Sequence, residues 1–453
     1  MADGSDLQQV TQMLVEEAGQ LARRESDRSQ PQRLLLLELF NRRESFAYLW
    51  YLVHYWSEWR LAGHLDVVLT PQFLQNHPEI LDLVKRQATP NIQITAIAPE
   101  MAALLIASDR PPKRNNRPQQ MLQPFRAWSV LCHYARQLQS TQCLVMDLDG
   151  VALPLALAAQ APCPISGLCF HPLRDRLGDH RPRDQKFSCS VIRSWQQRTL
   201  LHRILKRDHL KQLFCVDPLV VKLPLHLDPY GKAVPLPDPV HLQWEVPPAE
   251  NWCEQWAIEP GRRVFLYCTN DADHRSDHSS DIAGVSAMLE AIAHLPPSLC
   301  RQMCLVIVGQ LEPEAQSRLA YQVAALRRQR PVQVLSQVQA EGRQPLPIPL
   351  HLADVVVVPS RKTGYHGGLL TQAARLQTPI LTTDEGLIGE LVKRGQLGLT
   401  VRAGSTQHLA VALAYLLETP LEQVGDRQQM QQFAAWNTDV RFAATVFRYL
   451  CPL

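Results

Sequence analysis

Residues 350–375 read LHLADVVVVPSRKTGYHGGLLTQAAR. The apolar run Val355 to Val358 ends at Pro359 and Ser360, which is typical of a strand buried on both faces of a parallel sheet. Three glycines follow, Gly364, Gly367 and Gly368, and helical spacing begins at Leu369. Glycines let a backbone approach a ligand closely, and the N-terminus of a helix offers free N–H groups to an anion. The stretch therefore predicts a strand, an anion-binding loop and a helix.

A second strand, Pro379 to Thr383, and a second glycine turn at Gly386 follow. This order of elements resembles the C-terminal half of the group 1 glycosyltransferases, which have the GT-B fold. The residues that carry the resemblance are Ala353-Asp354 through Ser360, Gly364-Tyr365, Gln372-Ala373, Pro379-Ile380, Gly386 through Val392, Gly395 and Gly398. Some other doubly wound α/β domain is the alternative interpretation.

The resemblance implies an α/β protein with two Rossmann-like domains facing a cleft, an extra N-terminal helix, and C-terminal helices that cross back. It also implies transfer of a sugar from a nucleotide-sugar donor to an acceptor, with retention of configuration. Neither the acceptor nor the donor sugar can be named from the resemblance.

The family brackets its glycine loop with two glutamates, one near the reacting sugar and one on the nucleotide ribose. Here the second position is Gln372, and the first falls on Gly364 or Thr363. A glutamine can still hydrogen-bond the ribose hydroxyls, but it supplies no negative charge. A catalytically silent relative that acts as a binding, scaffold or regulatory protein is therefore the main alternative to an enzyme.

The implied donor site consists of Thr363, Gly364, Gly367, Gly368 and Leu369 around the diphosphate, with Gln372 at the ribose. The family's phosphate-binding lysine and its glycine align with Ala283-Gly284, so the lysine is absent. We expect Arg275 or Arg361 to supply the cation, because an arginine suits bidentate phosphate contact. No metal and no cofactor are expected, since these cations and the helix dipole would offset the charge of the leaving diphosphate.

His171 follows the predicted strand Pro164 to Phe170, at the end of a sheet where open α/β folds place ligands. Family members carry a histidine at such a position beside the transferred sugar, so the resemblance implies His171 as the catalytic candidate. A loop histidine with a local hydrogen bond is the alternative. The turn Asn41 to Glu44 after the first strand lacks the family's glycines.

Predicted strands alternate with helices along most of the chain, which favours βαβ units and parallel sheets. We expect an N-terminal helix and linker over 1–30 and an acceptor domain over 31–240. A donor domain is expected over 241–435, and a final helix over 436–453 that packs on the first domain. The proline-rich segment Asp217 to Glu250 is predicted to be the linker between the domains.

The composition excludes several classes of protein. A net charge of +3 on 453 residues gives no argument for a nucleic-acid partner. The longest apolar runs are far shorter than the ~20 residues of a membrane-spanning helix. No signal-peptide pattern opens the sequence, and the 11 cysteines contain no CxxC pair. We therefore expect a cytoplasmic protein.

The predicted helix over residues 45–61 is unusually aromatic, with Phe46, Tyr48, Trp50, Tyr51, Tyr55, Trp56 and Trp59. One interpretation is a core helix packed on the sheet. The other is a partly exposed face that docks on a protein partner or on the surface of a membrane.

Two further motifs compete with this account. Asp147 to Gly150, DLDG, resembles the DxDG motif of haloacid-dehalogenase-type phosphatases, where paired aspartates and Mg²⁺ act as nucleophile and general acid. That family's downstream lysine and acidic pair have no convincing counterpart before the linker. The Asp- and His-rich segment Asn270 to Asp281 follows no known metal-binding spacing, so we expect no metal site there.

Overall fold

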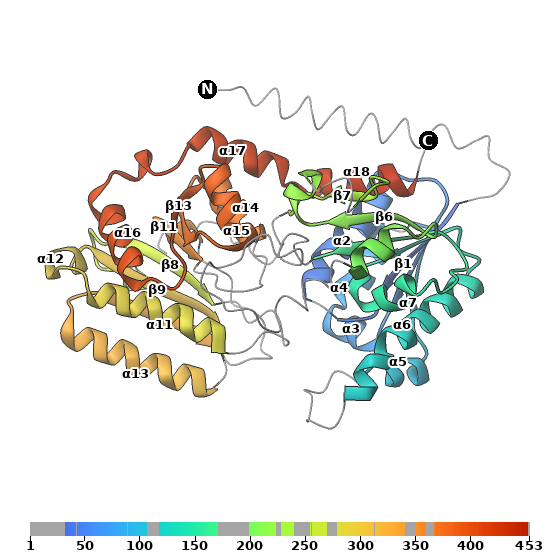
Figure 1. Ribbon diagram of the computed structural model, residues 1–453, viewed down its shortest axis with the longest axis horizontal. Helices are drawn as coiled ribbons and strands as arrows, with labels where there is room; N and C mark the ends of the chain where they lie inside the picture. Colours follow the sequence, from blue (N-terminus) through green and yellow to red (C-terminus); the bar gives the residue numbers. More distant parts are fainter. Residues whose placement is uncertain are drawn as a thin grey trace. The chain divides into compact units, whose positions relative to one another are not determined.

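The computed structural model describes residues 32–41, 43–87, 89–106, 117–170, 199–222, 228–239, 254, 256–269, 279–311, 313–339, 350–358 and 367–451 (Figure 1). The chain divides into two compact units. Unit 1 is Met1–Pro237 with Asp439–Leu453, and unit 2 is Asp238–Thr438. Each unit is an α/β structure built on one parallel sheet, as the resemblance implied. The predicted N-terminal helix lies outside the described residues.

Unit 1 contains a seven-stranded sheet in the order β3-β2-β1-β4-β5-β6-β7. The leucines of its central strand are buried on both faces because helices cover the whole sheet. The strands are β1 (Arg33–Glu38), β2 (His64–Leu69), β3 (Ile92–Ala96), β4 (Gln142–Val145), β5 (Ile165–Cys169), β6 (Leu210–Cys215) and β7 (Ala233–Pro235). The helices are α2 (Arg43–Glu58), α3 (Pro71–Asn76), α4 (Glu79–Gln87), α5 (Pro99–Ile106), α6 (Arg117–Gln137), α7 (Ala152–Ala156) and α18 (Asp439–Leu450).

Strand β7 lies inside the segment that the sequence predicts to be a linker. It pairs with β6 in parallel and forms the edge of the sheet. Pro235 is tolerated there because an edge strand has one side on which no ladder hydrogen bond is needed. The prediction of a continuous linker over 217–250 is therefore wrong at this strand, and the abundance of proline was misleading.

Unit 2 contains a six-stranded parallel sheet in the order β10-β9-β8-β11-β12-β13. Its strands are β8 (Arg263–Thr269), β9 (Met303–Gln310), β10 (Gln333–Gln339), β11 (Val355–Val358), β12 (Ile380–Thr383) and β13 (Gly398–Val401). The four valines of β11 are all buried. The prediction of a doubly buried strand at Val355 to Val358 is confirmed.

Helices cover both faces of this sheet (Figure 1). One face packs on α11 (Ser279–Ala293), α13 (Pro313–Gln329) and α16 (Thr406–Glu418), and the other is covered by α14 (Gly367–Arg375) and α15 (Gly386–Arg394). Helix α17 (Arg427–Trp436) contacts α14, and the short α12 (Pro297–Cys300) precedes β9. The change of face follows from right-handed crossovers that run outward in both directions from β8 and β11.

The aromatic helix α2 packs inside unit 1. Phe46, Tyr48, Tyr51, Tyr55 and Trp56 are buried, which confirms the core-helix interpretation. Trp50 of the helix and Trp59, which follows its last residue, are partly exposed. The docking of a partner or membrane on this helix stays a prediction.

The last helix, α18, lies on α2. The ring of Phe447 is 5.6 Å from that of Trp56, and the ring of Phe442 is 5.0 Å from that of Tyr48. The hydroxyl of Tyr55 donates a hydrogen bond to Asp439 Oδ2 at 2.9 Å. Burial, together with the charge of Asp439, raises the pKa of Tyr55 well above its usual range.

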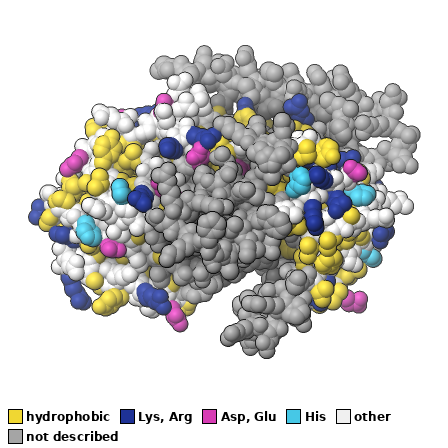
Figure 2. All heavy atoms as spheres, in the orientation of Figure 1, with side chains coloured by type: hydrophobic (Ala, Val, Ile, Leu, Met, Phe, Trp, Pro, Cys, Tyr) yellow, Lys and Arg dark blue, Asp and Glu magenta, His cyan; other side chains and the backbone are white. Residues whose placement is uncertain are grey.

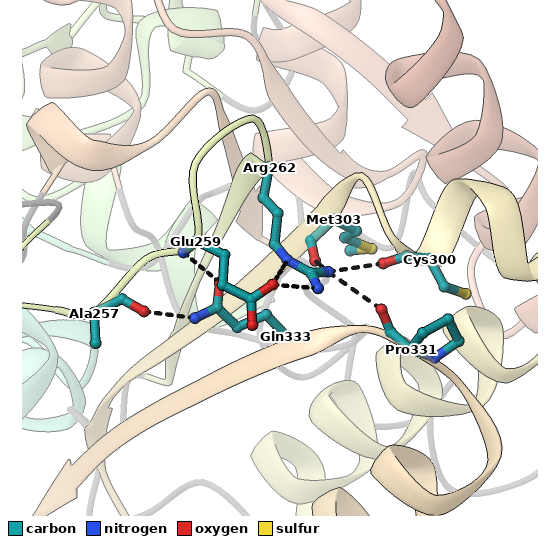
Figure 3. A network of polar contacts seen from close by, with 7 residues as sticks. All are labelled: Ala257, Glu259, Arg262, Cys300, Met303, Pro331 and Gln333. Atoms are coloured by element: carbon teal, nitrogen blue, oxygen red, sulfur yellow. Dashed lines mark hydrogen bonds and ion pairs between the residues drawn. The ribbon is translucent and has the colours of Figure 1, made fainter.

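Arg262 holds together the edge of the unit 2 sheet at which the strands begin (Figure 3). Its Nη1 donates to the carbonyl oxygens of Cys300, Met303 and Pro331 at 3.2, 3.0 and 3.2 Å. Its Nη2 pairs with Glu259 Oε2 at 2.5 Å. One guanidinium next to the start of β8 therefore satisfies carbonyl groups at the end of α12, at the first residue of β9 and just before β10.

None of the helices that the structure describes is long and apolar enough to cross a lipid bilayer.

Replacing Arg262 by alanine should lower the free energy of unfolding of unit 2 by about 1–3 kcal/mol, because several carbonyl groups would lose their donor. Arg262→Lys should give an intermediate loss, since an ammonium lacks the planar fork. Urea denaturation of both variants measures the effect. Equal stability of Arg262→Ala and the wild type would contradict this role.

Replacing Tyr55 by phenylalanine should reduce the stability of unit 1 at pH 8 by about 1–2 kcal/mol, because Asp439 would lose its donor. An unfolded tyrosine has a pKa of about 10, and the folded pKa of Tyr55 is raised. The contribution of Tyr55 is therefore fully present below pH ~10 and is lost as pH rises further. Denaturation at a series of pH values should show that the free energies of unfolding of the wild type and of Tyr55→Phe converge above pH ~10. A difference in free energy that grows above this pH would exclude the hydrogen bond.

Candidate functional site

The candidate site lies at the topological switch point of unit 2. Strand β8 is the neighbour of β11, with Tyr267 beside Val357, and the chain leaves these two strands in opposite directions. Open α/β sheets bind ligands at the carboxyl ends of the strands at such a point. Here those ends are Thr269 and Val358.

An aspartate fixes the register at the start of β11. The carboxylate of Asp354 accepts the N–H of Val264 at 2.7 Å, and the N–H of Asp354 donates to the carbonyl of Val264 at 3.0 Å. Burial raises the pKa of Asp354, while the Val264 N–H and the charge of Arg263 act in the opposite direction. The aspartate of the ADVVVV motif is therefore a structural residue at the edge remote from the site.

Helix α14 supplies the predicted donor-binding residues that the structure describes. It begins at Gly367, so its free N–H groups lie at the carboxyl edge of the sheet. Gly368 and Leu369 form its first turn, and Leu369 is buried. The strand and helix of the predicted strand–loop–helix unit are both present.

Gln372 is the distinctive residue of this helix. Its side chain is only 4% exposed, and its Oε1 accepts no hydrogen bond from the described residues. Its neighbour Thr371, by contrast, donates from Oγ1 to the carbonyl of Asp238 at 3.1 Å. A buried acceptor without a donor is unfavourable for folding, so a water molecule or a ligand is expected to donate to such a group.

The turn between β12 and α15 forms the next part of the same sheet edge. The hydroxyl of Thr382 donates to the carbonyl of Val358 at 2.6 Å and so ties β12 to the end of β11. Gly386 has a φ of 73°, a conformation that favours glycine. Gly389 brings α15 so close that a Cβ there would lie 2.8 Å from the carbonyl carbon of Asp384.

The remaining predicted residues are not placed by the structure. Thr363, Gly364, Arg361, Arg275 and His171 lie outside the described residues. The structure therefore brings together Gly367, Gly368, Leu369 and Gln372 on one helix, and it does not test the two arginines or the histidine.

Ala283 and Gly284 lie in α11, on the face of the sheet opposite α14. Ala283, which the resemblance aligns with the family's lysine, carries only a methyl group. Thr382 lies in the predicted strand Pro379 to Thr383, and Gly389 lies in the range Gly386 through Val392 that carries the resemblance. Their contacts could not be predicted, because a hydroxyl and a close backbone contact leave no pattern that distinguishes these two residues from ordinary small ones.

The DLDG motif has a local structural role. Asp147 is buried, and its side chain accepts the N–H of Asp149 at 3.2 Å at the start of the short 3₁₀ helix Leu148–Val151. Gly150 lies against the ring of Phe40, where a larger residue would not fit without a shift. Within the described ranges no three His, Cys, Asp or Glu side chains are grouped as a metal ion would need.

The described surface visible in Figure 2 mixes basic, acidic and apolar side chains. Lys and Arg are scattered rather than gathered in one large basic area. This distribution on the visible described surface agrees with the small net charge of the chain.

Replacing Gly389 by alanine should lower the free energy of unfolding of unit 2 by about 1–3 kcal/mol, because α15 would have to move away from the backbone of residues 383–384. Lys393→Ala, at an exposed position of the same helix, should change it by less than about 0.5 kcal/mol. Denaturant titration measures both. If Gly389→Ala unfolded at the same denaturant concentration as the wild type, the close approach of α15 to residues 383–384 would not be required.

Residues 276–419 match the family model described as "Glycosyl transferases group 1". None of the curated proteins compared with this chain resembles it in sequence. Solved structures resemble it over nearly its whole length.

Sucrose-phosphate synthase from Thermosynechococcus elongatus is 16% identical, with a TM-score of 0.59, and the match covers 92% of this chain and 99% of that one. HepE from Anabaena, solved in complex with UDP and glucose, is 13% identical with a TM-score of 0.58, over 94% of this chain and 100% of that one. A glycosyltransferase from Rickettsia africae is 10% identical with a TM-score of 0.58, over 94% and 100% of the two chains.

At these identities the structural likeness shows the fold, and the family match covers the segment that contains α14 and Gln372. Residues 276–419 thus match the model of the group 1 glycosyltransferases, and the chain has the fold of the GT-B glycosyltransferases of known structure that it resembles.

Proposed function

We propose that this chain transfers a sugar from a nucleotide-sugar to an acceptor. The observation that carries the proposal is the buried Oε1 of Gln372, which has no donor among the described residues. It lies on the helix that follows the switch-point strand, inside the segment that matches the family. A ribose hydroxyl would donate to this oxygen and remove the cost of its burial.

Unit 2 would bind the donor. The diphosphate would lie at the start of α14, where the backbone N–H groups of Gly367, Gly368 and Leu369 are free of helical partners. Thr363 and Gly364 would complete the loop around it. Support comes from the anion-binding character of a helix N-terminus and from HepE, whose structure contains UDP and glucose.

Arg275 and Arg361 would supply the positive charge that the missing lysine leaves absent. Both flank the switch point in the sequence, since Arg275 follows β8 and Arg361 follows β11. With the dipole of α14 they would stabilise the leaving diphosphate, so the proposed mechanism requires no metal ion. His171 is proposed as the catalytic residue beside the transferred sugar, and retention of configuration follows from the family resemblance alone.

A catalytically silent, nucleotide-binding relative is the second candidate. The observation that favours it is Gln372 itself, because an amide at this position brings no negative charge to the site. Such a protein would bind the nucleotide-sugar without turning it over. We place either protein in the cytoplasm, since the described cysteines form no disulfide.

A thermal-shift screen against UDP-, GDP- and ADP-sugars should reveal one stabilising nucleotide. A ligand at a hundred times its Kd adds about 2.7 kcal/mol to the free energy of unfolding. Release or transfer of radiolabelled sugar from that nucleotide then separates the enzyme from the silent relative.

The two arginines are tested by Arg275→Ala and Arg361→Ala. Unchanged donor affinity in both variants would contradict the roles given to these arginines.

Gln372→Met should act in opposite directions on stability and on binding. Methionine is apolar and of similar length, so removal of a buried acceptor without a donor should leave the free energy of unfolding unchanged or raise it by up to about 1 kcal/mol. Affinity for the nucleotide should fall by about tenfold or more, since a hydrogen bond to the ribose would be lost.

Gln407→Met, at an exposed position of α16, is the matched control and should change neither quantity. A Gln372→Met variant that is less stable but binds the nucleotide normally would show that Gln372 has a structural partner and no role at the donor.

A further inference from the structure

The outer strand of the unit 2 sheet, β10, has one side with which no described strand pairs. It is seven residues long and follows β9 in parallel along its whole length in one continuous register. It is longer than the other edge strands that the structure describes, β3, β7 and β13. An edge strand presents a row of backbone N–H and C=O groups that can pair with another strand.

Strand β10 lacks the features that usually keep an edge strand from pairing. Its sequence, QVLSQVQ, contains no charged residue and no proline. Ser336 and Gln337 in its middle are both exposed, although successive side chains of a strand point to opposite faces of the sheet. Both faces are therefore open beside the middle of this edge.

Two contacts occupy the start of the edge. The side chain of Gln333 donates to the carbonyl of Ala257 at 2.6 Å and accepts the N–H of Glu259 at 3.0 Å (Figure 3). Arg327 donates to the carbonyl of Val334. A carbonyl oxygen has two lone pairs, so this contact still allows Val334 to pair with a further strand. The part of the edge that is open to pairing begins at Val334.

The sequence of β10 is nearly symmetric about Ser336. Read from either end, the strand has glutamine first, valine second and serine in the middle. In an antiparallel pair of two such strands centred on Ser336, Val334 of each copy faces Val338 of the other, and serine faces serine. Val334 lies in the hydrophobic core and Val338 packs against it, so the facing valines share one face of the sheet. The partner that fits this edge is a second copy of the same strand.

Helix α13 would lie beside its counterpart in such a pair. It connects β9 to β10, and because neighbouring strands are ~4.8 Å apart, the two copies of α13 would be roughly 10 Å apart, the spacing of packed helices. Figure 1 shows α13 beside α11 at the margin of the unit. The side of α13 toward α11 carries Gln322, which accepts from Ser286 at 3.0 Å, and the side toward the edge carries Arg327. Ala320 and Ala324 are exposed on the edge side, where their methyl groups let the two helices approach.

The charges on α13 are complementary in the same arrangement. Glu314 belongs to its first turn, and Arg327 and Arg328 belong to its last turn. A twofold axis between the paired strands makes the two copies of α13 antiparallel, so the acidic first turn of each lies near the basic last turn of the other. Opposite charges attract there, whereas a parallel arrangement would bring like charges together.

We propose that two copies of this chain associate through β10, antiparallel about a twofold axis at Ser336. The backbone groups of residues 334–338 pair with those of the second copy, and the two six-stranded sheets become one. Because each copy uses the same surface, the contact closes at a dimer. None of the predicted donor-binding residues belongs to β10 or α13, so the dimer needs no nucleotide.

Sedimentation velocity of the full chain tests the dimer at a series of concentrations up to ~100 μM, since an interface of one strand and one helix is small and weak. We expect monomers at low concentration and dimers at high concentration. A monomer at every concentration would overturn the proposal. The edge would then be occupied by another protein or by a segment of this chain outside the described residues.

Ser336→Lys would place two like charges face to face at the axis and should weaken association by about tenfold or more. Ser129→Lys, the same change at an exposed position of α6, should leave association unchanged. Because Ser336 is exposed, the lysine should not disturb the fold of the monomer, which circular dichroism checks. Wild-type association of Ser336→Lys would place the interface elsewhere and overturn the proposal.

Ser336→Cys tests the position of the axis. Residues that face each other in antiparallel strands have Cβ atoms about 4.5–5.5 Å apart, which is close to the separation in a disulfide. Oxidation with copper phenanthroline should therefore join two Ser336→Cys chains covalently, and the wild type and Ser129→Cys should stay as single chains. No covalent dimer of Ser336→Cys, or equal yields from the two cysteine variants, would refute an axis at Ser336.

Discussion

The parallel pairing of β8 with β11 is the contact on which the rest of unit 2 depends. These strands are neighbours in the sheet, although most of a domain separates them in the sequence. The carboxylate of Asp354 fixes their register at one edge, and the hydroxyl of Thr382 fixes the end of β11 at the other. Because the crossovers diverge from this pair, α11 and α14 begin at the same edge of the sheet on opposite faces, and both helix N-termini lie at the carboxyl ends of the strands.

The burial of Gln372 connects this geometry to function. A carboxylate at a site this deeply buried would be unstable without a cation nearby, and the family resemblance aligns the family's lysine with Ala283. The same resemblance aligns Gln372 with a glutamate, so the two expected differences would each remove one charge. In the proposed donor site the amide would still hydrogen-bond a ribose hydroxyl, and Arg275 and Arg361 would have to supply the positive charge.

Much of the fold could be predicted from the sequence because its signals are local. The valine run of β11, the leucine run of β1 and the alternation of strands with helices each follow from burial on both faces of a parallel sheet. Strand β7 was missed because proline hides an edge strand. The short helices α3, α4 and α5 were missed because each is defined by its packing on the sheet rather than by a long repeat of apolar residues.

The candidate site could be predicted only where the family pattern is continuous. Gln372 was identified by its distance from the glycine loop, but its burial and its lack of a donor depend on tertiary packing, which no local pattern reveals. Titration calorimetry of the intact chain with UDP, GDP and ADP tests the central claim most directly. The account predicts saturable binding of one nucleotide per chain that Gln372→Met weakens, and the absence of binding by all three would contradict a nucleotide-sugar site in unit 2.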